Sequence, residues 1–445
     1  MTERDTTAQV ERAQSAALRL ANVDAADRDA ALGAIADAIR DNSEAILAAN
    51  REDVEEAEAM LADGEYTQAL VDRLKLDEAK LDDIAGMVES VAEQDDPLGE
   101  TLEARELDEE LELYKLSVPI GVVATIFESR PDALVQIAAL ALKSGNAVIL
   151  KGGSEASESN RVLYETILSA TEDLPDGWAT LIEAHEEVDR LLELDDMVDL
   201  VMPRGSSEFV SYIQDNTQIP VLGHTEGICH VYVDEAADLD MAEDIALDAK
   251  VQYPAVCNAV ETLLVHESVA EDLLPDLAAR YREADVELRG DERAREVVEM
   301  NAASEEDWST EYGDLILAVK IVDSLAEAID HVNTYGSKHT ESIVTETAEH
   351  AERFMRQIDA ASVFHNASTR FSDGYRFGLG AEVGISTGKI HARGPVGLEG
   401  LTTYKYHLEG DGQLVATYAG ENATPFLHED FDGEWVPGHL SGREE

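Results

Sequence analysis

The sequence is poor in cysteine and aromatic residues, and each shortage narrows what the protein can be. With only Cys229 and Cys257, the 445-residue chain can form one disulfide at most and no cysteine-rich metal cluster, which suits a reducing compartment. Aromatic residues make up 5% and hydrophobic residues 44%, so the core must consist mainly of Ala, Val, Leu and Ile, as in α/β proteins with parallel strands. The length predicts two or three domains.

Basic residues are also scarce, with 33 against 95 acidic ones and a formal net charge of −62. Such a charge repels itself strongly unless salt screens it, and at molar salt the Debye length falls to about 3 Å. Acidic residues run along the whole chain, whereas an acidic tail or a mimic of nucleic acid would gather them in one block. The composition therefore predicts a halophilic protein, and it argues against nucleic acid or an anionic membrane as a partner.

Long apolar runs are missing as well. No run reaches the roughly 20 residues that cross a bilayer, and the N-terminus MTERDTTAQVERAQ lacks the regions of a signal peptide. We therefore expect a cytoplasmic protein with no membrane partner.

The order of apolar patterns predicts an α/β fold. Residues 6–87 have Ala and Leu at helical spacing, and 107–116 alternate apolar and charged residues as in a half-exposed strand or hairpin arm. A βαβ unit follows, with strands at 121–127 and 146–151 around a helix at 133–143. Further strands are expected at 198–202, 228–233, 261–265, 315–322, 342–345 and 362–365. The pattern predicts two doubly wound domains.

Cys257 is the candidate nucleophile. It lies in KVQYPAVCNAVETLLVH, where Pro254 breaks a helix and an apolar strand starts three residues after the cysteine, so we expect the thiol on a connecting turn. Turns present side chains to clefts, but a single cysteine can equally be an inert packing residue. Position alone leaves both interpretations open.

The remaining thiol and several histidines suggest no further chemistry. Cys229 lies inside the apolar strand ICHVYV, where we expect it to be buried without a role. His230 in that strand, and His224 and His266 near strand ends, lack the paired spacing of a metal site. We expect no metal.

Two segments could bind cofactor phosphates, although the chain has no GxGxxG fingerprint there. In DLVMPRGSSEFVSYI, a strand, the Gly205–Ser206 turn and an amphipathic helix follow one another, and helix N-termini bind anions. An ordinary loop with Ser206 as the N-cap fits equally well. Lys151 ends a strand before two glycines, where it could contact an adenosine ribose or its 2′-phosphate, or remain solvated.

The Gly-rich segment from Val363 to Tyr406 is too long for a plain linker. Arginine matches carboxylate or phosphate with two parallel hydrogen bonds, so this segment suits an anionic substrate. The candidate binding residues are Asn366, Ser368, Thr369, Arg370, Glu382 and Arg393.

These segments in order resemble the aldehyde dehydrogenase superfamily, and within it the branch that reduces γ-glutamyl phosphate in proline synthesis. The most specific stretches are FESRPDALVQIAALALKSGNAVILKGG, MPRGS, VCNAVETLLVH and NTYGSKHTESIVTE, with the segment from Asn366 to Tyr406. The likeness covers most of the chain. It implies an aldehyde dehydrogenase-like fold with two doubly wound α/β domains and a small β oligomerisation element.

The resemblance implies a reaction as well as a fold. Cys257 would attack L-glutamyl 5-phosphate, release phosphate and form a thioester, which NADPH would reduce to L-glutamate 5-semialdehyde. The backbone N–H groups near Cys257 and Asn258 would hold the oxyanion. Relatives add an Asn side chain from a Trp-Asn-Phe-Pro stretch, where this sequence has Arg130, which we assign to substrate binding.

Further roles follow from the resemblance. Lys151, Gly205 and Ser206 would bind NADP(H), and Glu311 would hold the nicotinamide ribose. Hydrolytic relatives have a water-activating Glu in an ELGG stretch, which here reads GHTE and ends at Glu226, three positions further along. Lys338 stands where the family pattern has Gly.

The implied domains are an NADP-binding domain at 1–102 and 118–254, and a catalytic domain at 255–398. Residues 103–117 and 399–420 would form the oligomerisation element of a dimer or tetramer, and an acidic C-terminal tail would follow at 421–445.

Two other functions stay open at this point. One is a semialdehyde dehydrogenase of the same fold that forms a free acid or a CoA thioester, and the other is a halophilic scaffold that has lost catalysis. Complex formation with glutamate 5-kinase, which would supply the unstable substrate, is also left open.

Overall fold

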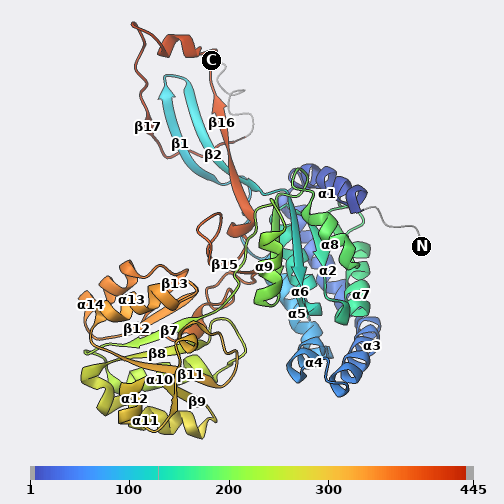
Figure 1. Cartoon of the computed structure of the whole chain (residues 1–445). Helices are drawn as coiled ribbons and strands as arrows, with labels where there is room; N and C mark the ends of the chain where they lie inside the picture. Colours follow the sequence, from blue (N-terminus) through green and yellow to red (C-terminus); the bar gives the residue numbers. More distant parts are fainter. Residues whose placement is uncertain (1–5, 129, 437–445) are drawn as a thin grey trace. The chain divides into compact units, whose positions relative to one another are not determined.

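The computed structural model describes residues 6–128 and 130–436. The chain divides into two units. The first consists of Met1–Gly205, Asp215–Val221 and Gly397–Glu445, and the second of Ser206–Gln214 and Leu222–Val396. Figure 1 labels their helices and strands.

The first unit begins with the expected helices. Ala, Leu and Ile recur at three- and four-residue spacing and supply the buried side chains of each long helix. The side chains of Thr67 and Asp77 cap two of the helices by accepting backbone N–H bonds. The helices are α1 (Thr6–Leu20), α2 (Ala25–Asp41), α3 (Ser43–Ala62), α4 (Gln68–Leu74) and α5 (Glu78–Ala92).

A four-stranded parallel sheet follows, in the order β5-β4-β3-β6. Its strands are β3 (Val122–Phe127), β4 (Ala147–Lys151), β5 (Ala179–Leu181) and β6 (Leu200–Arg204), and its helices and helical turns are α6 (Pro131–Lys143), η1 (Ser154–Ala156), α7 (Ser157–Ala170) and α8 (His185–Leu192). The chain order reverses between β3 and β6. Parallel α/β sheets bind ligands beyond the carboxyl ends of their strands at such a point.

The first unit also contains an antiparallel sheet, ordered β16-β2-β1-β17 (Figure 1). Its strands are β1 (Thr101–Asp108), β2 (Leu111–Pro119), β16 (Thr402–Glu409) and β17 (Glu429–Asp430), with η4 (Glu399–Leu401) and η5 (Val415–Tyr418) beside them in sequence. The segment 107–116 is a hairpin that turns at residues 109–110, as one of the expected readings had it.

The segment after residue 420 is more ordered than a loose tail. β17 pairs with β1, and Trp435 packs against a small cluster of Ala104, Tyr114 and Leu116. The Trp435 indole N–H donates to Glu409 at 2.7 Å. The expected tail therefore returns to the antiparallel sheet, because it carries apolar side chains that can be covered there. Residues 437–445 lie outside the described part.

The second unit is built on seven parallel strands in the order β10-β9-β11-β8-β7-β12-β13. Buried Val, Leu and Ile from β7, β8 and β11 form its core with the inner faces of α10 and α11. The strands are β7 (Cys229–Val233), β8 (Val260–His266), β9 (Glu287–Gly290), β10 (Asn301–Ala302), β11 (Ile316–Val322), β12 (Thr340–Val344) and β13 (Ser362–His365).

The other elements of this unit connect or follow those strands. They are α9 (Ser207–Asp215), α10 (Leu239–Val251), α11 (Glu267–Glu283), α12 (Glu292–Val297), η2 (Glu306–Ser309), α13 (Leu325–Tyr335), α14 (Ala348–Gln357), η3 (Thr369–Phe371), β14 (Gly384–Ser386) and β15 (Gly394–Val396). Asp215, the last residue of α9, is assigned to the first unit.

The boundary expected at residue 254 needs correction. β7 pairs with both β8 and β12 and therefore belongs to the second sheet. α10 follows it in the same unit, whose main segment starts at Leu222. The predicted strand positions hold, but strand order is a long-range property that spacing does not reveal. Among the described residues, no helix has the length and apolar character to cross a membrane.

Candidate active site

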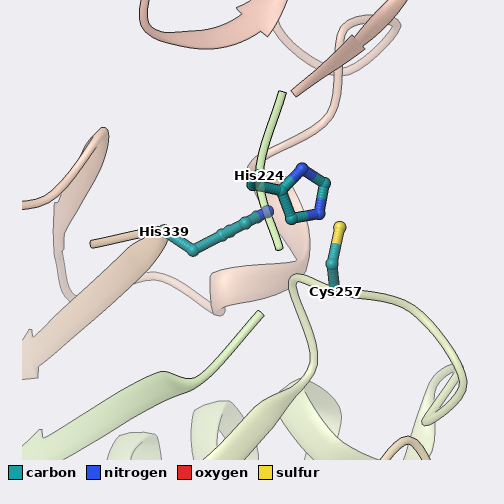
Figure 2. A group of neighbouring side chains, drawn as sticks. All are labelled: His224, Cys257 and His339. Carbon is teal, nitrogen blue, oxygen red and sulfur yellow. The ribbon is translucent and has the colours of Figure 1, made fainter. Parts of the chain in front are cut away.

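Three functional side chains precede three neighbouring strands of the second sheet. His224 lies five residues before β7, Cys257 three residues before β8, and His339 directly before β12. These strands are parallel and adjacent in the order β8-β7-β12, so their amino ends share one edge of the sheet. The fold therefore brings together residues that are up to 115 positions apart, and Figure 2 shows their side chains converging.

Cys257 lies on the turn between α10 and β8, as expected from Pro254, and its side chain is partly exposed. Gly227 packs against the backbone of this turn, where an added Cβ would lie 2.1 Å from the Cys257 carbonyl oxygen. Any larger residue would displace the turn. Across residues 6–128 and 130–436, no acceptor lies within hydrogen-bond reach of the backbone N–H groups of Cys257 and Asn258.

His224 and His339 flank the thiol (Figure 2). Their rings lie 5.0 Å apart between centroids at an interplanar angle of 70°, and each residue has a ring nitrogen within 4.8 Å of Cys257 Sγ. His224 Nδ1 is 2.9 Å from the Ile385 carbonyl oxygen. His339 is fully buried, and its Nε2 has no hydrogen-bond partner among the described residues.

Cys229 has a different environment. It is fully buried in β7, as expected, and its thiol donates to the Cys257 carbonyl oxygen at 3.2 Å. Burial raises the pKa of Cys229 well above its ordinary value, which keeps this thiol protonated and unreactive. Of the two thiols, Cys257 is the accessible one.

Arg370 is a buried cation within electrostatic range of Cys257. It is 7% exposed, its Nε donates to Gln252 at 2.9 Å, and its Nη1 has no partner in the described parts of the chain. Burial lowers the pKa of Arg370, and Arg376 adds to this, whereas the charge on Cys257 acts in the opposite direction. A buried guanidinium with an unmatched N–H is suited to an anionic oxygen.

A second group of cations surrounds Asp359 just before β13. Lys389 and Arg393 lie 3.0 and 2.9 Å from its carboxylate, and Lys338 lies 3.5 Å away. The hydrogen bonds from Lys389 and Arg393 lower the pKa of Asp359 to about 2. Three cations around one carboxylate leave a local positive charge in a strongly acidic chain. One of these cations, Lys338, directly precedes His339 in the sequence.

The other predicted substrate residues differ in their surroundings. Thr369 is fully buried, and the Ser368 hydroxyl accepts the Arg370 N–H at the start of η3. The side-chain amide of Asn366 accepts from the Thr345 backbone N–H and donates to the Thr345 carbonyl oxygen. These bonds lie beyond the carboxyl ends of β12 and β13. Asn366 therefore does not join the group at the amino edge. Its φ of 54° also marks it as a turn residue.

The Asn258 side chain is engaged as well. Its amide nitrogen donates to the Ser372 carbonyl oxygen at 2.8 Å and ties the Cys257 turn to the segment after η3. The side chain thus positions the turn, and the backbone N–H remains available for a ligand.

The predicted cofactor residues lie in both units. Lys151 ends β4, and Gly205 follows β6 at the switch point of the first sheet, while Ser206 begins the second unit. Arg130 is the N-cap residue of α6 in the first unit. Glu311 lies half-buried in the loop before β11 in the second unit.

Nothing in the sequence indicated that His224 and His339 lie at the thiol. His224 lacked the spacing of a metal site, and the stretches GHTE and YGSKHTE that contain the two histidines differ from the family pattern at Glu226 and Lys338. Glu226 is exposed, whereas His224 lies at the thiol. Lys338 has φ of 66°, the left-handed region that favours glycine, which explains why glycine suits this position.

Comparisons with known proteins agree with this site. The sequence model of the aldehyde dehydrogenase family matches residues 1–307. The γ-glutamyl phosphate reductase of Natronomonas pharaonis is 74% identical over 98% of this chain and 100% of its own length. That of Haloquadratum walsbyi is 68% identical over 95% of this chain and 94% of its own. Both relatives come from halophiles, as the acidic composition predicted.

The fold is also found in a solved structure. The crystal structure of γ-glutamyl phosphate reductase from Thermotoga maritima superposes with a TM-score of 0.89 at 40% identity, covering 92% of this chain and 99% of that one. The expected aldehyde dehydrogenase-like α/β fold is thus confirmed. The chain belongs to the aldehyde dehydrogenase family.

Proposed function

We propose that this protein is a reductase that converts L-glutamyl 5-phosphate to L-glutamate 5-semialdehyde and phosphate, with NADPH as reductant and a thioester on Cys257. The observation that carries the proposal is the setting of Cys257, a partly exposed thiol on a turn with open backbone N–H groups and within electrostatic range of the buried cation Arg370. The reductases that this chain resembles over nearly its whole length act on the same substrate by name. The reaction is the second step of proline synthesis from glutamate.

In the acylation step, Cys257 Sγ bonds to the γ-carbonyl carbon and the bond from that carbon to the phosphate oxygen breaks. Phosphate leaves with the electron pair, and the proton of the thiol passes to solvent. The backbone N–H groups of Cys257 and Asn258 would donate to the oxygen on which negative charge develops. Asn258 acts through its bond to Ser372, which holds this turn in place.

The substrate carries negative charge at both ends, and the cations of the second unit suit it. Arg370 Nη1 would donate to the acyl phosphate, because the group is buried and charged and has an open N–H. Arg393, with Lys389, would receive the α-carboxylate. Ser368 and Thr369 would support Arg370 from η3. Arg130 remains a further candidate contact from the first unit.

The first unit fits a phosphorylated dinucleotide. Lys151 ends β4 with its ammonium on the Gly152 carbonyl oxygen at 2.5 Å, and a Cβ on Gly152 or Gly153 would lie 2.1 Å from a neighbouring side chain. The Asn160 and Glu155 side chains fill the space beside the two glycines, so the feature that suits a phosphate is the lysine at the carboxyl edge of a parallel sheet. Lys151, Gly205 and Ser206 would bind the cofactor, and Glu311 its nicotinamide ribose.

Members of the family use NAD or NADP. When bound, NADPH supplies the hydride that reduces the thioester carbon. The C–S bond then breaks, its electron pair returns to Cys257 Sγ, and the aldehyde leaves. The exposed side chain of Glu226 makes it a poor base for water at the thiol, which suits a reductase because hydrolysis would waste the thioester.

The assembly we propose is a cytoplasmic homo-oligomer, a dimer or tetramer. β16 forms one edge of the antiparallel sheet and exposes Tyr404, Tyr406 and Leu408 on alternate positions. An apolar edge strand of this kind is suited to pairing with a second copy. A complex with glutamate 5-kinase would protect the unstable substrate.

The test is the reverse reaction in molar potassium chloride. NADP reduction by glutamate semialdehyde is measured with and without phosphate, for the wild-type protein and Cys257→Ala. We expect reduction that requires both phosphate and Cys257. Reduction without phosphate would instead identify a hydrolytic dehydrogenase, and no reduction by folded protein would favour a scaffold or another acyl phosphate.

A further inference from the structure

We infer that His224, Cys257 and His339 form a binding site for a thiophilic divalent metal ion, with Zn²⁺ as the fitting ion, and that the metal reversibly blocks the thiol. One ligand atom from each residue lies within 4.8 Å of the other two. Spacing in the sequence gave no sign of this group, because its members precede three different strands.

His224 is prepared as a ligand by its second nitrogen. A carbonyl oxygen only accepts hydrogen bonds, so the 2.9 Å contact with Ile385 requires the proton on Nδ1. The neutral ring then has its lone pair on Nε2. Histidines that bind metals usually donate their other ring N–H to a carbonyl or carboxylate in this way, which fixes the orientation of the ring.

His339 provides an independent indication. Its Nδ1 contacts the Thr340 hydroxyl at 2.9 Å and lies 3.7 Å from Cys229 Sγ, while Nε2 has no partner within the described residues. The ring is fully buried. A buried N–H without an acceptor is costly, so the proton belongs on Nδ1 and the open Nε2 presents a lone pair. A metal ion would satisfy that atom.

The donor set selects the metal. One sulfur and two imidazole nitrogens suit Zn²⁺, which binds them at about 2.3 and 2.0–2.1 Å and keeps a fourth position for water. Mg²⁺ and Ca²⁺ require oxygen ligands, and the group contains no carboxylate even though the chain has 95 acidic residues. Bonds of this length bring the donors closer together than the 4.8 Å within which they now lie, so the side chains must move towards one another when the ion binds.

Binding and catalysis exclude one another at Cys257. The thiol loses its proton to solvent as the sulfur bonds to the metal, and a sulfur held by the metal is no longer the attacking nucleophile. The ion therefore competes with the acyl phosphate. The metal site itself depends on no catalytic step, so it can be measured apart from the proposed function.

The experiment uses Co²⁺ as a spectroscopic substitute for Zn²⁺ in the full-length protein in molar potassium chloride. We expect a thiolate-to-cobalt charge-transfer band that Zn²⁺ abolishes and Mg²⁺ leaves unchanged. Cys257→Ser should lose the band, and His224→Gln and His339→Gln should each weaken Co²⁺ binding about 100-fold or more.

Two variants serve as matched controls. Cys229→Ala removes the other thiol, and His266→Asn removes an imidazole at the opposite end of β8, so both should keep the band. Zn²⁺ should also slow alkylation of Cys257 by iodoacetamide in Cys229→Ala. The inference is wrong if the wild type shows no band, if the band survives Cys257→Ser, or if neither histidine variant weakens binding.

Discussion

The second unit contains two clusters of polar side chains that differ in what their groups contact. The thiol site consists of His224, Cys257 and His339 at the amino edge of the sheet, where donor atoms face one another without hydrogen bonds between them. The second, called the polar cluster, lies on strands of the same sheet and on α13. Its members are His230, Lys320, His331 and Glu341.

In the polar cluster the groups bind each other. Glu341 accepts from both the backbone N–H and Nδ1 of His230, at 2.8 and 2.9 Å, and Lys320 lies 3.2 Å from His331. Burial raises the pKa of Glu341 and lowers that of His331 to about 2. His230 Nε2, His331 Nε2 and Glu341 Oε1 have no hydrogen-bond partner among the described residues, but all three residues are buried. The two clusters therefore differ in access, because the polar cluster is enclosed by the fold whereas Cys257 is partly exposed.

The largest contrast should come from substituting the two thiols. Cys257→Ser should lower turnover about 10⁴-fold or more, because the nucleophile is lost, with little change in the free energy of unfolding. Cys229→Ser should leave turnover within a few-fold and lower stability instead, since it places a hydroxyl in the core. Activity assays and denaturant unfolding check both. Equal losses of turnover in the two variants would contradict the distinction.

Within the polar cluster, His230→Leu should lower the free energy of unfolding by about 3 kcal/mol. The substitution removes the ring N–H that bonds the buried Glu341 carboxyl and leaves it only the backbone N–H of residue 230, and a lost bond to a buried carboxyl is costly. His230→Gln, which keeps an N–H near the carboxyl, should lose less. Chemical denaturation in molar salt measures the difference, and a Leu variant as stable as the wild type would show that the pair contributes nothing.

The contrast also explains what could be predicted from the sequence. Local signals were sufficient for the turn at Cys257, since Pro254 ends α10 and the apolar residues of β8 follow. They were sufficient for the burial of Cys229, which lies in a continuous apolar strand. Alternation was also sufficient for the hairpin at residues 107–116, but it did not indicate that β16 pairs with β2.

Long-range order could not be predicted in the same way. The convergence of His224 and His339 on the thiol depends on β12 lying beside β7, which no spacing in the chain encodes. The same strand order moved the unit boundary from 254 to 221. The surroundings of Asn366 could not be predicted for a related reason, because its turn follows β13 at the carboxyl ends of the strands and its amide bonds to Thr345.

The two thiols should also differ in their rates of alkylation. This difference is smaller than the difference in turnover, but it measures the accessibility of each thiol directly. Iodoacetamide should modify Cys257 about 100-fold faster than Cys229, because Cys229 is fully buried and burial raises its pKa. Mass spectrometry of peptides after timed alkylation gives both rates. Similar rates in folded protein would mean that β7 opens as readily as the Cys257 turn.

The polar cluster should also make stability depend on pH through His331. Its pKa is about 2 in the folded protein and ordinarily 6.5, so the unfolded chain binds a proton that the folded chain refuses between these values. The stability that His331 contributes is complete above pH 6.5 and falls as the pH decreases. From pH 7 to pH 5 this loss amounts to about 2 kcal/mol. Unfolding of the wild type and His331→Leu at both pH values should show a fall smaller by that amount in the variant. An equal fall in both proteins would mean that His331 is protonated inside the fold, and the polar cluster would then not be closed to protons.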